Sequence, residues 1–379
     1  MEINRILFQS IQQQCFKGRI ILLTGPRRVG KSTMIHHLCK QNGAYLFLDG
    51  DDPTVRNSLD TPNFEQIRIL LGSYKLVFID EAQRIKNIGL TLKMIHDRIK
   101  GVQVIVSGSS ALDLGDKLQE SLTGRKWEYH LYPISWEEWF RHNDYLTVSQ
   151  QLESRILYGM FPEVLNHPGS EEQILKELTK SYLYKDILAL SGIKKPDVLE
   201  KLVMALAFQI GNEVSYNELS QLVGVDKNTI ATYIELLEKA FVVYRLNPYS
   251  ANQRNEIKTH RKIYFYDTGV RNAVINNFNP ITLRNDKGAL WENFVINERM
   301  KFLEYHQKNI QSYFWRARQG GEVDLLEHKN GKLHAYEIKW NKLSKFKLPI
   351  AFTKSYQADF TGIHTENFLL FVSEINKGV

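Results

Sequence analysis

The stretch RIILLTGPRRVGKSTMIHHLCKQ, residues 19–41, decides the fold of the first part of this chain. Its apolar run at 20–23 predicts a buried strand, and the residues from Ser32 onward predict a helix. Between them lies the pattern Gly25-x-x-x-x-Gly30-Lys31-Ser32, which is the P-loop. The glycines permit tight turns, so that successive backbone N–H groups face phosphate oxygens at the helix N-terminus. The stretch therefore predicts a site for a nucleoside triphosphate.

The polar residues of this pattern predict how ATP and Mg²⁺ are held. We expect Lys31 to reach the β- and γ-phosphates and the Ser32 hydroxyl to enter the Mg²⁺ shell. A loop without a ligand is the alternative, and the flanking strand and helix argue against it. The residues expected to contact ATP are Gly25, Pro26, Arg27, Arg28, Val29, Gly30, Lys31, Ser32 and Thr33.

A second stretch, KLVFIDEAQ at residues 75–83, supports the nucleotide site. It is an apolar strand that ends in Asp80 and Glu81, the Walker B layout. Parallel strands carry such carboxylates to the sheet edge where ligands bind. We expect Asp80 to hold Mg²⁺ and Glu81 to orient or deprotonate the attacking water. Alone this motif is common, but together with a P-loop it is specific.

The next apolar run, VQVIVSGSSA at residues 102–111, ends in Ser107, Ser109 and Ser110. We expect Ser109 to sense the γ-phosphate, while a strand that simply leaves the sheet through a Ser/Gly turn is the alternative. Further strands are predicted at AYLFLD (44–49) and EYHLYPIS (128–135). Strands that alternate with helices predict an α/β domain with a parallel sheet.

Composition limits the classes to which the chain can belong. Its 379 residues exceed one usual domain, and 43% hydrophobic residues suffice for several cores. Cys15 and Cys39 lie outside any CxxC or Cys/His cluster, which argues against thiolate zinc sites and disulfide frameworks. No apolar run approaches about 18 residues, so we expect a cytoplasmic protein without a membrane segment. The net charge of +7 fits polyanionic partners or merely solvated basic faces.

Residues 20–140 resemble the AAA-type ATPases of bacteria and archaea, through TGPRRVGKST, FIDEAQ, VSGSS and LTGRKWEYHLYPISWEEW in this order. The whole chain is similar to a prokaryotic group in which such an ATPase precedes a C-terminal region of unknown function. The resemblance implies ATPase activity and places Arg125 of LTGRK at the group's Gly-Arg position. There Arg125 is either an arginine finger for a neighbouring subunit of a homo-oligomer or part of a structural salt bridge.

The middle of the chain predicts a winged helix-turn-helix at SYNELSQLVGVDKNTIATYIELLEKAFVVYRL, residues 215–246. Ser215 with Glu218 forms a helix start, Gly224 forms a turn, and a strand follows the second helix. That helix has residues suited to phosphates and base edges, namely Lys227, Asn228, Thr229, Thr232 and Tyr233. DNA is the expected partner, and a protein-binding module is the alternative. The basic segment that follows lines a nucleic-acid path or forms a solvated wing, through Arg254, Lys258, His260, Arg261 and Lys262.

The C-terminal stretch GEVDLLEHKNGKLHAYEIK, residues 321–339, predicts a hairpin around Asn-Gly. Period-two alternation puts Glu337 and Lys339 on one face of its second strand. Asp324 lies on the first strand, and Glu292 lies on the preceding helix. Glu292, Asp324 and Glu337 are then candidate Mg²⁺ ligands for phosphodiester cleavage, with Lys339 beside the attacking water. The order of elements resembles the restriction-endonuclease-like fold, and ordinary charges on a hairpin face are the alternative.

Together these patterns predict an α/β chain of four parts. They are an AAA-type P-loop domain at 1–145, a helical connector at 146–195, a winged helix-turn-helix at 196–280 and a restriction-endonuclease-like domain at 281–379. The expected function is Mg²⁺-dependent ATP hydrolysis coupled to a nucleic-acid-binding, nuclease-like region. The alternative is an ATP-dependent switch that binds DNA or a protein through an inactive nuclease-like domain, because a fold does not guarantee its activity.

Overall fold

The computed structural model describes residues 3–61, 63–109, 121–180, 196–250, 261–317 and 320–375. The chain divides into an N-terminal unit, residues 2–133 with 239–241, and a C-terminal unit, residues 134–238 with 242–379. Among the helices in these described ranges, none combines the length and the apolar character needed to cross a membrane.

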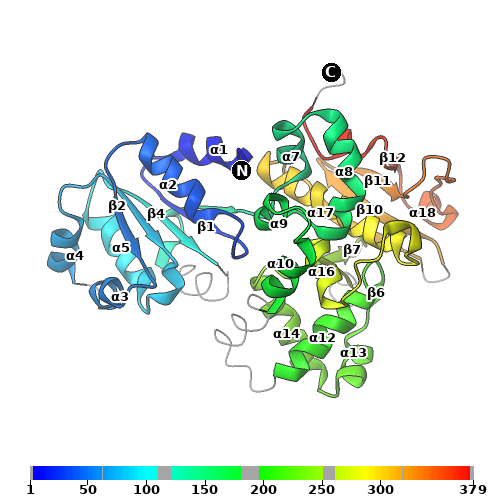
Figure 1. Cartoon of the computed structure of the whole chain (residues 1–379), viewed down its shortest axis with the longest axis horizontal. Helices are drawn as coiled ribbons and strands as arrows, with labels where there is room; N and C mark the ends of the chain where they lie inside the picture. Colours follow the sequence, from blue (N-terminus) through cyan, green and yellow to red (C-terminus); the bar gives the residue numbers. More distant parts are fainter. Residues whose placement is uncertain are drawn as a thin grey trace. The chain divides into compact units, whose positions relative to one another are not determined.

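Helices and strands alternate in the N-terminal unit (Figure 1). The strand predicted at 128–135 ends earlier than expected, because its partner strand ends at Thr24, which pairs with His130. In chain order the elements are α1 Ile6–Gln14, β1 Ile20–Thr24, α2 Lys31–Gln41, β2 Leu46–Asp49, α3 Pro53–Asp60, α4 Phe64–Leu71, β3 Leu76–Asp80, η1 Ala82–Arg84, α5 Ile88–Arg98, β4 Gln103–Gly108 and β5 Lys126–His130.

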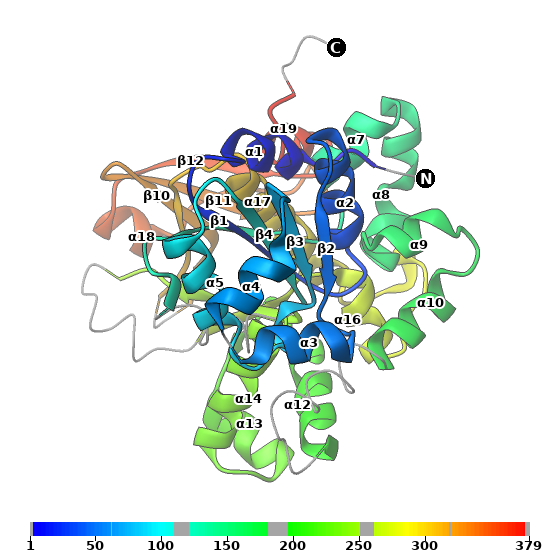
Figure 2. The ribbon, with the colours of Figure 1, turned by 90° about the vertical axis from the view of Figure 1, so that its left-hand side faces the viewer.

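The strands of this unit form a five-stranded parallel sheet in the order β2-β3-β4-β1-β5. Alternate apolar side chains of β1, β3 and β4 pack with α3, α4 and α5 in one buried cluster. Figure 2 shows these three helices in the foreground of the unit. Because the strands are parallel, the C-terminal ends of β1, β3 and β4 meet at one edge of the sheet. The predicted α/β fold with a parallel sheet is confirmed for this unit.

The C-terminal unit begins with helices and ends with a mixture of strands and helices (Figure 1). Its elements are α7 Trp136–His142, α8 Tyr145–Tyr158, α9 Pro162–Asn166, α10 Glu171–Leu178, α12 Pro196–Phe208, β6 Glu213–Val214, α13 Tyr216–Val223, α14 Lys227–Lys239, β7 Val243–Pro248, β8 Arg261–Phe265, α16 Thr268–Val274, η3 Ile281–Leu283, α17 Lys287–Tyr305, β9 Gln311–Arg316, β10 Glu322–Lys329, β11 Lys332–Ile338, α18 Ile350–Ser355, β12 Ala358–Ile363 and α19 Phe368–Phe371.

One sheet, in the order β12-β11-β10-β9-β7-β8-β6, runs through this unit. β10 pairs antiparallel with β9 and β11, and β12 lies parallel to β11. The predicted hairpin of β10 and β11 is confirmed, and its turn residues Asn330 and Gly331 have φ values of 51° and 78°. β7 and β9 pair in parallel. The strands near α13 and α14 are thus continuous with those of the C-terminal hairpin.

Candidate functional site

Two glycines bend the loop between β1 and α2. Gly25 has a φ of 148°, and a Cβ at this position would lie 2.0 Å from the backbone oxygen of Leu131. Gly30 has a φ of 92° and forms the N-cap of α2. Both positions therefore favour glycine. The first backbone N–H groups of α2 have no acceptor within the helix, so they are available to an anion.

Lys31, the first residue of α2, folds its side chain over this loop. The residue is 6% exposed, and its Nζ donates to the carbonyl oxygens of Gly25 at 2.8 Å and Pro26 at 2.7 Å. Burial lowers the pKa of Lys31 to about 8, although the carboxylates of Glu81 and Asp80 act in the opposite direction. A buried ammonium held by neutral carbonyls is electrostatically suited to accept an anion.

The Walker B carboxylates stand at the end of β3, as the sequence predicts. The backbone N–H of Glu81 donates to Asp80 Oδ1 at 3.0 Å, and the buried Ser107 hydroxyl of β4 donates to the same oxygen. Glu81 has a left-handed φ of 46°. Such a conformation costs a non-glycine residue roughly 1–3 kcal/mol and is concentrated at functional sites. The serine that contacts Asp80 is therefore Ser107.

Gln83 links the Walker B strand to Ser109, the residue that the sequence favoured as a γ-phosphate sensor. Its amide nitrogen donates to Glu81 and, at 2.9 Å, to Ser109 Oγ. Arg27 Nε donates to the same hydroxyl at 3.5 Å. Gln83 is buried, and within the described residues its Oε1 accepts no hydrogen bond. Sequence analysis gave Gln83 no role, and Ser110 lies outside the described residues.

Arg125 lies at the other end of the parallel sheet, directly before β5. Its Nε and Nη2 donate to the two carboxylate oxygens of Asp97 in α5, at 2.9 and 3.2 Å. This hydrogen bond to Arg125, followed by that to His96, lowers the pKa of Asp97 to about 2. Within its own chain Arg125 thus takes part in a salt bridge. Its role toward a neighbouring chain stays a prediction.

The groups at the C-terminal edge of the parallel sheet fit a nucleoside triphosphate with Mg²⁺. Lys31 supplies a buried positive charge, and Asp80 with Ser32 supplies the hard oxygen ligands that Mg²⁺ prefers. Thr24, at the end of β1, has a buried hydroxyl that makes no hydrogen bond to the described residues. A buried ammonium, oxygen atoms of the kind that bind Mg²⁺ and a further polar group are therefore all present at the C-terminal edge of the parallel sheet.

A second group of charged side chains lies in the C-terminal unit. Carboxylate oxygens of Glu292, Glu322 and Asp324 all lie within 4.8 Å of one another. Glu292 comes from α17, whereas Glu322 and Asp324 share one face of β10 because strand side chains alternate with a period of two. The sequence predicted Glu292 and Asp324 for this site and missed Glu322. The spacing of two residues from Asp324 was the signal that could have found it.

Lys262 of β8 contacts two of these carboxylates. Its Nζ lies 2.8 Å from Glu292 Oε1 and also pairs with Glu322, and its side chain is fully buried. Burial acts to lower the pKa of Lys262, but Glu292 and Glu322 outweigh burial and raise it. Lys262 therefore neither lines a nucleic-acid path nor lies on a solvated wing, because its place in β8 turns it toward the carboxylates. The basic residues at 254–260 lie outside the described residues.

The remaining predicted residues of this site stand apart from the three carboxylates. Glu337 and Lys339 share a face of β11 as predicted, and they form an ion pair of 2.8 Å. Glu337 does not belong to the group of three. Asp324 Oδ2 accepts the Ile338 N–H at 2.7 Å. Burial, followed by the nearby Glu292 carboxylate, raises the pKa of Asp324 to about 8.

Asn293, the neighbour of Glu292, fixes α17 on β8. Its side-chain amide donates to the carbonyl oxygen of Phe265 at 2.9 Å, and its Oδ1 accepts the Phe265 N–H at 3.0 Å. The Tyr264 hydroxyl donates to Glu292 Oε1 at 2.6 Å. These contacts hold Glu292 over β8. Because they join residues that are far apart in the sequence, no local sequence pattern could have indicated them.

Helix α14 has a buried face and an exposed face. Asp226 caps its first turn by accepting the N–H groups of Asn228 at 2.9 Å and Thr229 at 3.0 Å, and the Thr229 hydroxyl also donates to Asp226. The buried face consists of Ile230, Ile234 and Leu237. Of the residues predicted to meet nucleic acid, three are exposed, namely Lys227, Asn228 and Thr232, whereas Thr229 and Tyr233 are half-buried.

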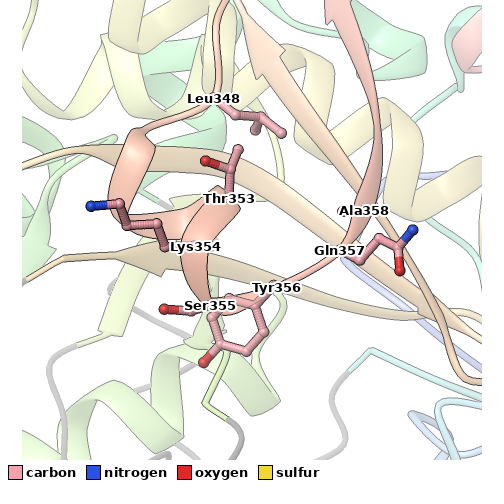
Figure 3. A pocket seen from close by; sticks show the side chains of 7 residues that line it. All are labelled: Leu348, Thr353, Lys354, Ser355, Tyr356, Gln357 and Ala358. Carbon is pink, nitrogen blue, oxygen red and sulfur yellow. The ribbon is translucent and has the colours of Figure 1, made fainter.

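A hollow of about 450 Å³ lies beside β12, an edge strand of the seven-stranded sheet. Figure 3 shows its lining side chains along α18 and the turn into β12: Leu348, Thr353, Lys354, Ser355, Tyr356, Gln357 and Ala358. Lys345, Lys347 and Lys354 are exposed near this edge. Lys342, by contrast, is 2.8 Å from Glu366. Exposed lysines therefore stand near this edge, together with the exposed Asp359 of β12.

Three family models match parts of this chain. Residues 17–140 match the model of an AAA domain. Residues 149–280 and 287–370 match two domains of unknown function, DUF8612 and DUF4143. The AAA match, with the parallel five-stranded sheet, supports a P-loop ATPase domain at the N-terminus and hence ATP binding and hydrolysis.

Similar proteins occur in distant prokaryotes. An uncharacterized protein of Mycobacterium tuberculosis is 28% identical over 336 residues, which cover 87% of this chain and 72% of that protein. An uncharacterized protein of Haemophilus influenzae is 26% identical over 341 residues, covering 84% and 78% of the two chains. Among solved structures, the Walker-type ATPase of Pyrococcus abyssi is similar over 72% of this chain and 96% of its own, at 15% identity and a TM-score of 0.49.

Proposed function

We propose that this chain is a Mg²⁺-dependent ATPase whose nucleotide state controls a DNA-binding, nuclease-like C-terminal unit. The observation that carries the ATPase half is the buried Lys31 at the sheet edge where Asp80 and Glu81 end β3. Lys31 neutralises phosphate charge, Asp80 and Ser32 hold Mg²⁺, and Glu81 orients or deprotonates the attacking water. Ser107 of β4 and Ser109, which follows directly after β4, are the polar groups that respond to the γ-phosphate.

The order of elements around α14 supports a winged helix-turn-helix. Helices α12, α13 and α14 are combined with β6, β7 and β8, and β8 pairs antiparallel with both other strands. In such folds the last helix enters the major groove. Lys227, Asn228 and Thr232 are exposed on that helix and suit phosphates and base edges. DNA contact by α14 is therefore the expected mode of binding.

The elements after residue 287 support a restriction-endonuclease-like fold. A helix, α17, precedes the antiparallel strands β9, β10 and β11, and α18 then leads to β12, which lies parallel to β11. Glu292 and Asp324 converge, and exposed lysines stand beside the β12 edge. Basic side chains of this kind suit a phosphate backbone. The C-terminal unit thus has two surfaces for a polyanion.

Phosphate release from MgATP tests the ATPase half. Turnover should be lost in Lys31→Ala and strongly reduced in Glu81→Gln, each folded by circular dichroism. Turnover that persisted at the wild-type rate in both variants would refute the assignment of the site.

Fluorescence anisotropy with labelled duplex DNA tests the proposed control of DNA binding by the nucleotide. The binding is measured once with MgADP and once with Mg²⁺ and a non-hydrolysable ATP analogue. Affinity should differ between the two nucleotide states and fall with salt. Lys227→Ala should reduce the salt slope by about 0.9 if it removes one phosphate contact. Lys201→Ala removes an equally exposed lysine from α12 and should leave the slope unchanged. Equal slopes in both variants would refute DNA contact by α14.

A regulator that binds a protein is the second candidate. The side chains of Phe208 in α12 and Leu222 in α13 are each 64% exposed, and such large apolar groups are also used by winged helices in protein contacts. This candidate predicts an ATPase with no DNA affinity near physiological salt.

A further inference from the structure

Two of the three carboxylates of the C-terminal cluster, Glu292 and Glu322, already have cationic partners. Glu292 Oε1 accepts hydrogen bonds from Lys262 Nζ at 2.8 Å and from the Tyr264 hydroxyl at 2.6 Å. Glu322 pairs with Lys262 and lies 3.7 Å from Arg316 Nη1. The ammonium of Lys262 contacts two carboxylates from different elements and offsets their negative charge, as a bound metal cation would. It can do so because it is a compact positive charge with three hydrogen-bond donors.

The position of Lys262 leaves its ammonium little freedom to move away. The side chain is fully buried, and Nζ lies 5.7 Å from the ring centre of Phe314. β8 is an inner strand, paired on one side with β6 and on the other with β7. A divalent ion would need carboxylate oxygens at about 2.0–2.6 Å. The ammonium contacts Oε1 of Glu292 and Oε1 of Glu322, so a divalent ion that used these oxygens would have to displace it.

We propose that Lys262 is the resident cation of the cluster of Glu292, Glu322 and Asp324, so that this cluster binds no divalent metal and the unit cuts no phosphodiester bond. Glu337 and Lys339 form their own ion pair beside it and supply no second metal position. This inference rests on the proposed function in one respect, namely that DNA is the ligand of the C-terminal unit. It adds that the nuclease-like unit binds DNA without cleaving it.

The ion pairs of the cluster then have a structural role, which is to hold two parts of the C-terminal unit together. Lys262 belongs to the strands around α14, whereas Glu292 and Glu322 belong to the helix and strand of the nuclease-like part. The ion pairs therefore tie the two parts together across the same sheet that β7 and β9 make continuous.

A titration of the full chain with Mn²⁺ tests the proposal. The electron paramagnetic resonance signal of the free ion reports how much Mn²⁺ stays unbound. The samples contain neither nucleotide nor DNA. Wild type and Asp324→Asn should bind equal numbers of Mn²⁺ ions. Lys262→Met should bind one additional Mn²⁺ per chain, and the double variant Lys262→Met/Asp324→Asn should lose it. Lys301→Met is the matched control, because Lys301 is also fully buried and paired with a glutamate, and it should gain no ion.

Two results of the Mn²⁺ titration would overturn the proposal. One is an Mn²⁺ ion that wild type binds and Asp324→Asn does not. The other is a folded Lys262→Met that gains no ion. If Lys262→Met does not fold, the comparison of wild type with Asp324→Asn still decides, since it leaves Lys262 in place. Plasmid cleavage in Mg²⁺ or Mn²⁺ that is lost in Asp324→Asn would likewise overturn it. If wild type bound neither DNA nor a metal ion at this cluster, the proposed function would be refuted, whereas the proposal about the metal would stand.

Discussion

Binding of ATP at alkaline pH should load a proton onto Lys31. In the nucleotide-free chain burial lowers the pKa of Lys31 to about 8, so that about one-tenth of the chains carry the charge at pH 9. Phosphate oxygens beside the ammonium favour its charged form and raise this pKa. Binding should therefore take up about 0.9 proton per chain at pH 9 and only about 0.1 at pH 7, where Lys31 is already charged.

The same linkage sets the pH dependence of affinity. Because the charged form binds, the dissociation constant should rise about fivefold between pH 8 and pH 9 and more steeply above it. The measurement is isothermal titration with Mg²⁺ and a non-hydrolysable ATP analogue, in two buffers of different ionisation heat at each pH. The difference in heat between the buffers gives the number of protons.

Lys31→Arg is the control for this measurement, because a guanidinium stays charged throughout the range. Its proton uptake at pH 9 should be near zero, whatever its affinity. A wild-type uptake below about 0.2 proton at pH 9 would show that Lys31 is charged before ATP binds, and would refute the argument from burial.

Single contacts set three other expectations. Glu81→Gln should keep nucleotide binding and lower phosphate release by roughly 10²–10⁴-fold, and unchanged turnover would exclude Glu81 as the base. Gly25→Ala should abolish nucleotide binding, because its Cβ would lie 2.0 Å from a backbone oxygen, whereas Gly288→Ala, with open space around it, should bind normally in the same titration. Arg299→Met should destabilise the C-terminal unit in urea by roughly 3–5 kcal/mol, since it leaves Glu327 buried without the two contacts at 2.7 and 2.8 Å. Arg299→Met/Glu327→Leu should recover most of that loss, and equal stability of the two variants would contradict this reading.

The nucleotide site was predictable because its geometry is local. A strand, a loop with two glycines and a helix lie within 19–41, and the spacing alone brings Lys31 beside the loop carbonyls. Asp80 is likewise placed by the end of its own strand. The contact of Ser107 with Asp80 depends instead on which strand lies next to β3, and β4 takes that place. Strand order is not written in any one segment, so the sequence did not indicate the contact of Ser107 with Asp80, and the role of Ser109 toward the γ-phosphate stays a prediction.

The carboxylate cluster was predictable only in part, for the same reason. Asp324 and the hairpin that carries it follow from an Asn-Gly turn and from alternation. Lys262 precedes Asp324 by 62 residues and reaches the cluster because β7, paired with β8, also pairs with β9. A basic run read in isolation looks like a solvated surface. Its position within the sheet decides that Lys262 is buried.

Two buried lysines show how charge balance separates the two sites. Lys31 donates to neutral carbonyl oxygens, and burial lowers its pKa to about 8 because it outweighs the carboxylates of Glu81 and Asp80, which form no ion pair with it among the described residues. Lys262 contacts the carboxylates of Glu292 and Glu322, which outweigh burial and raise its pKa. The first ammonium therefore gains from an arriving anion, whereas the second already has two carboxylate counter-ions and stands where a metal ion would have to bind. The partners of each ammonium thus indicate which site takes up a charged ligand, and the proton count at pH 9 and the Mn²⁺ titration measure the two consequences independently.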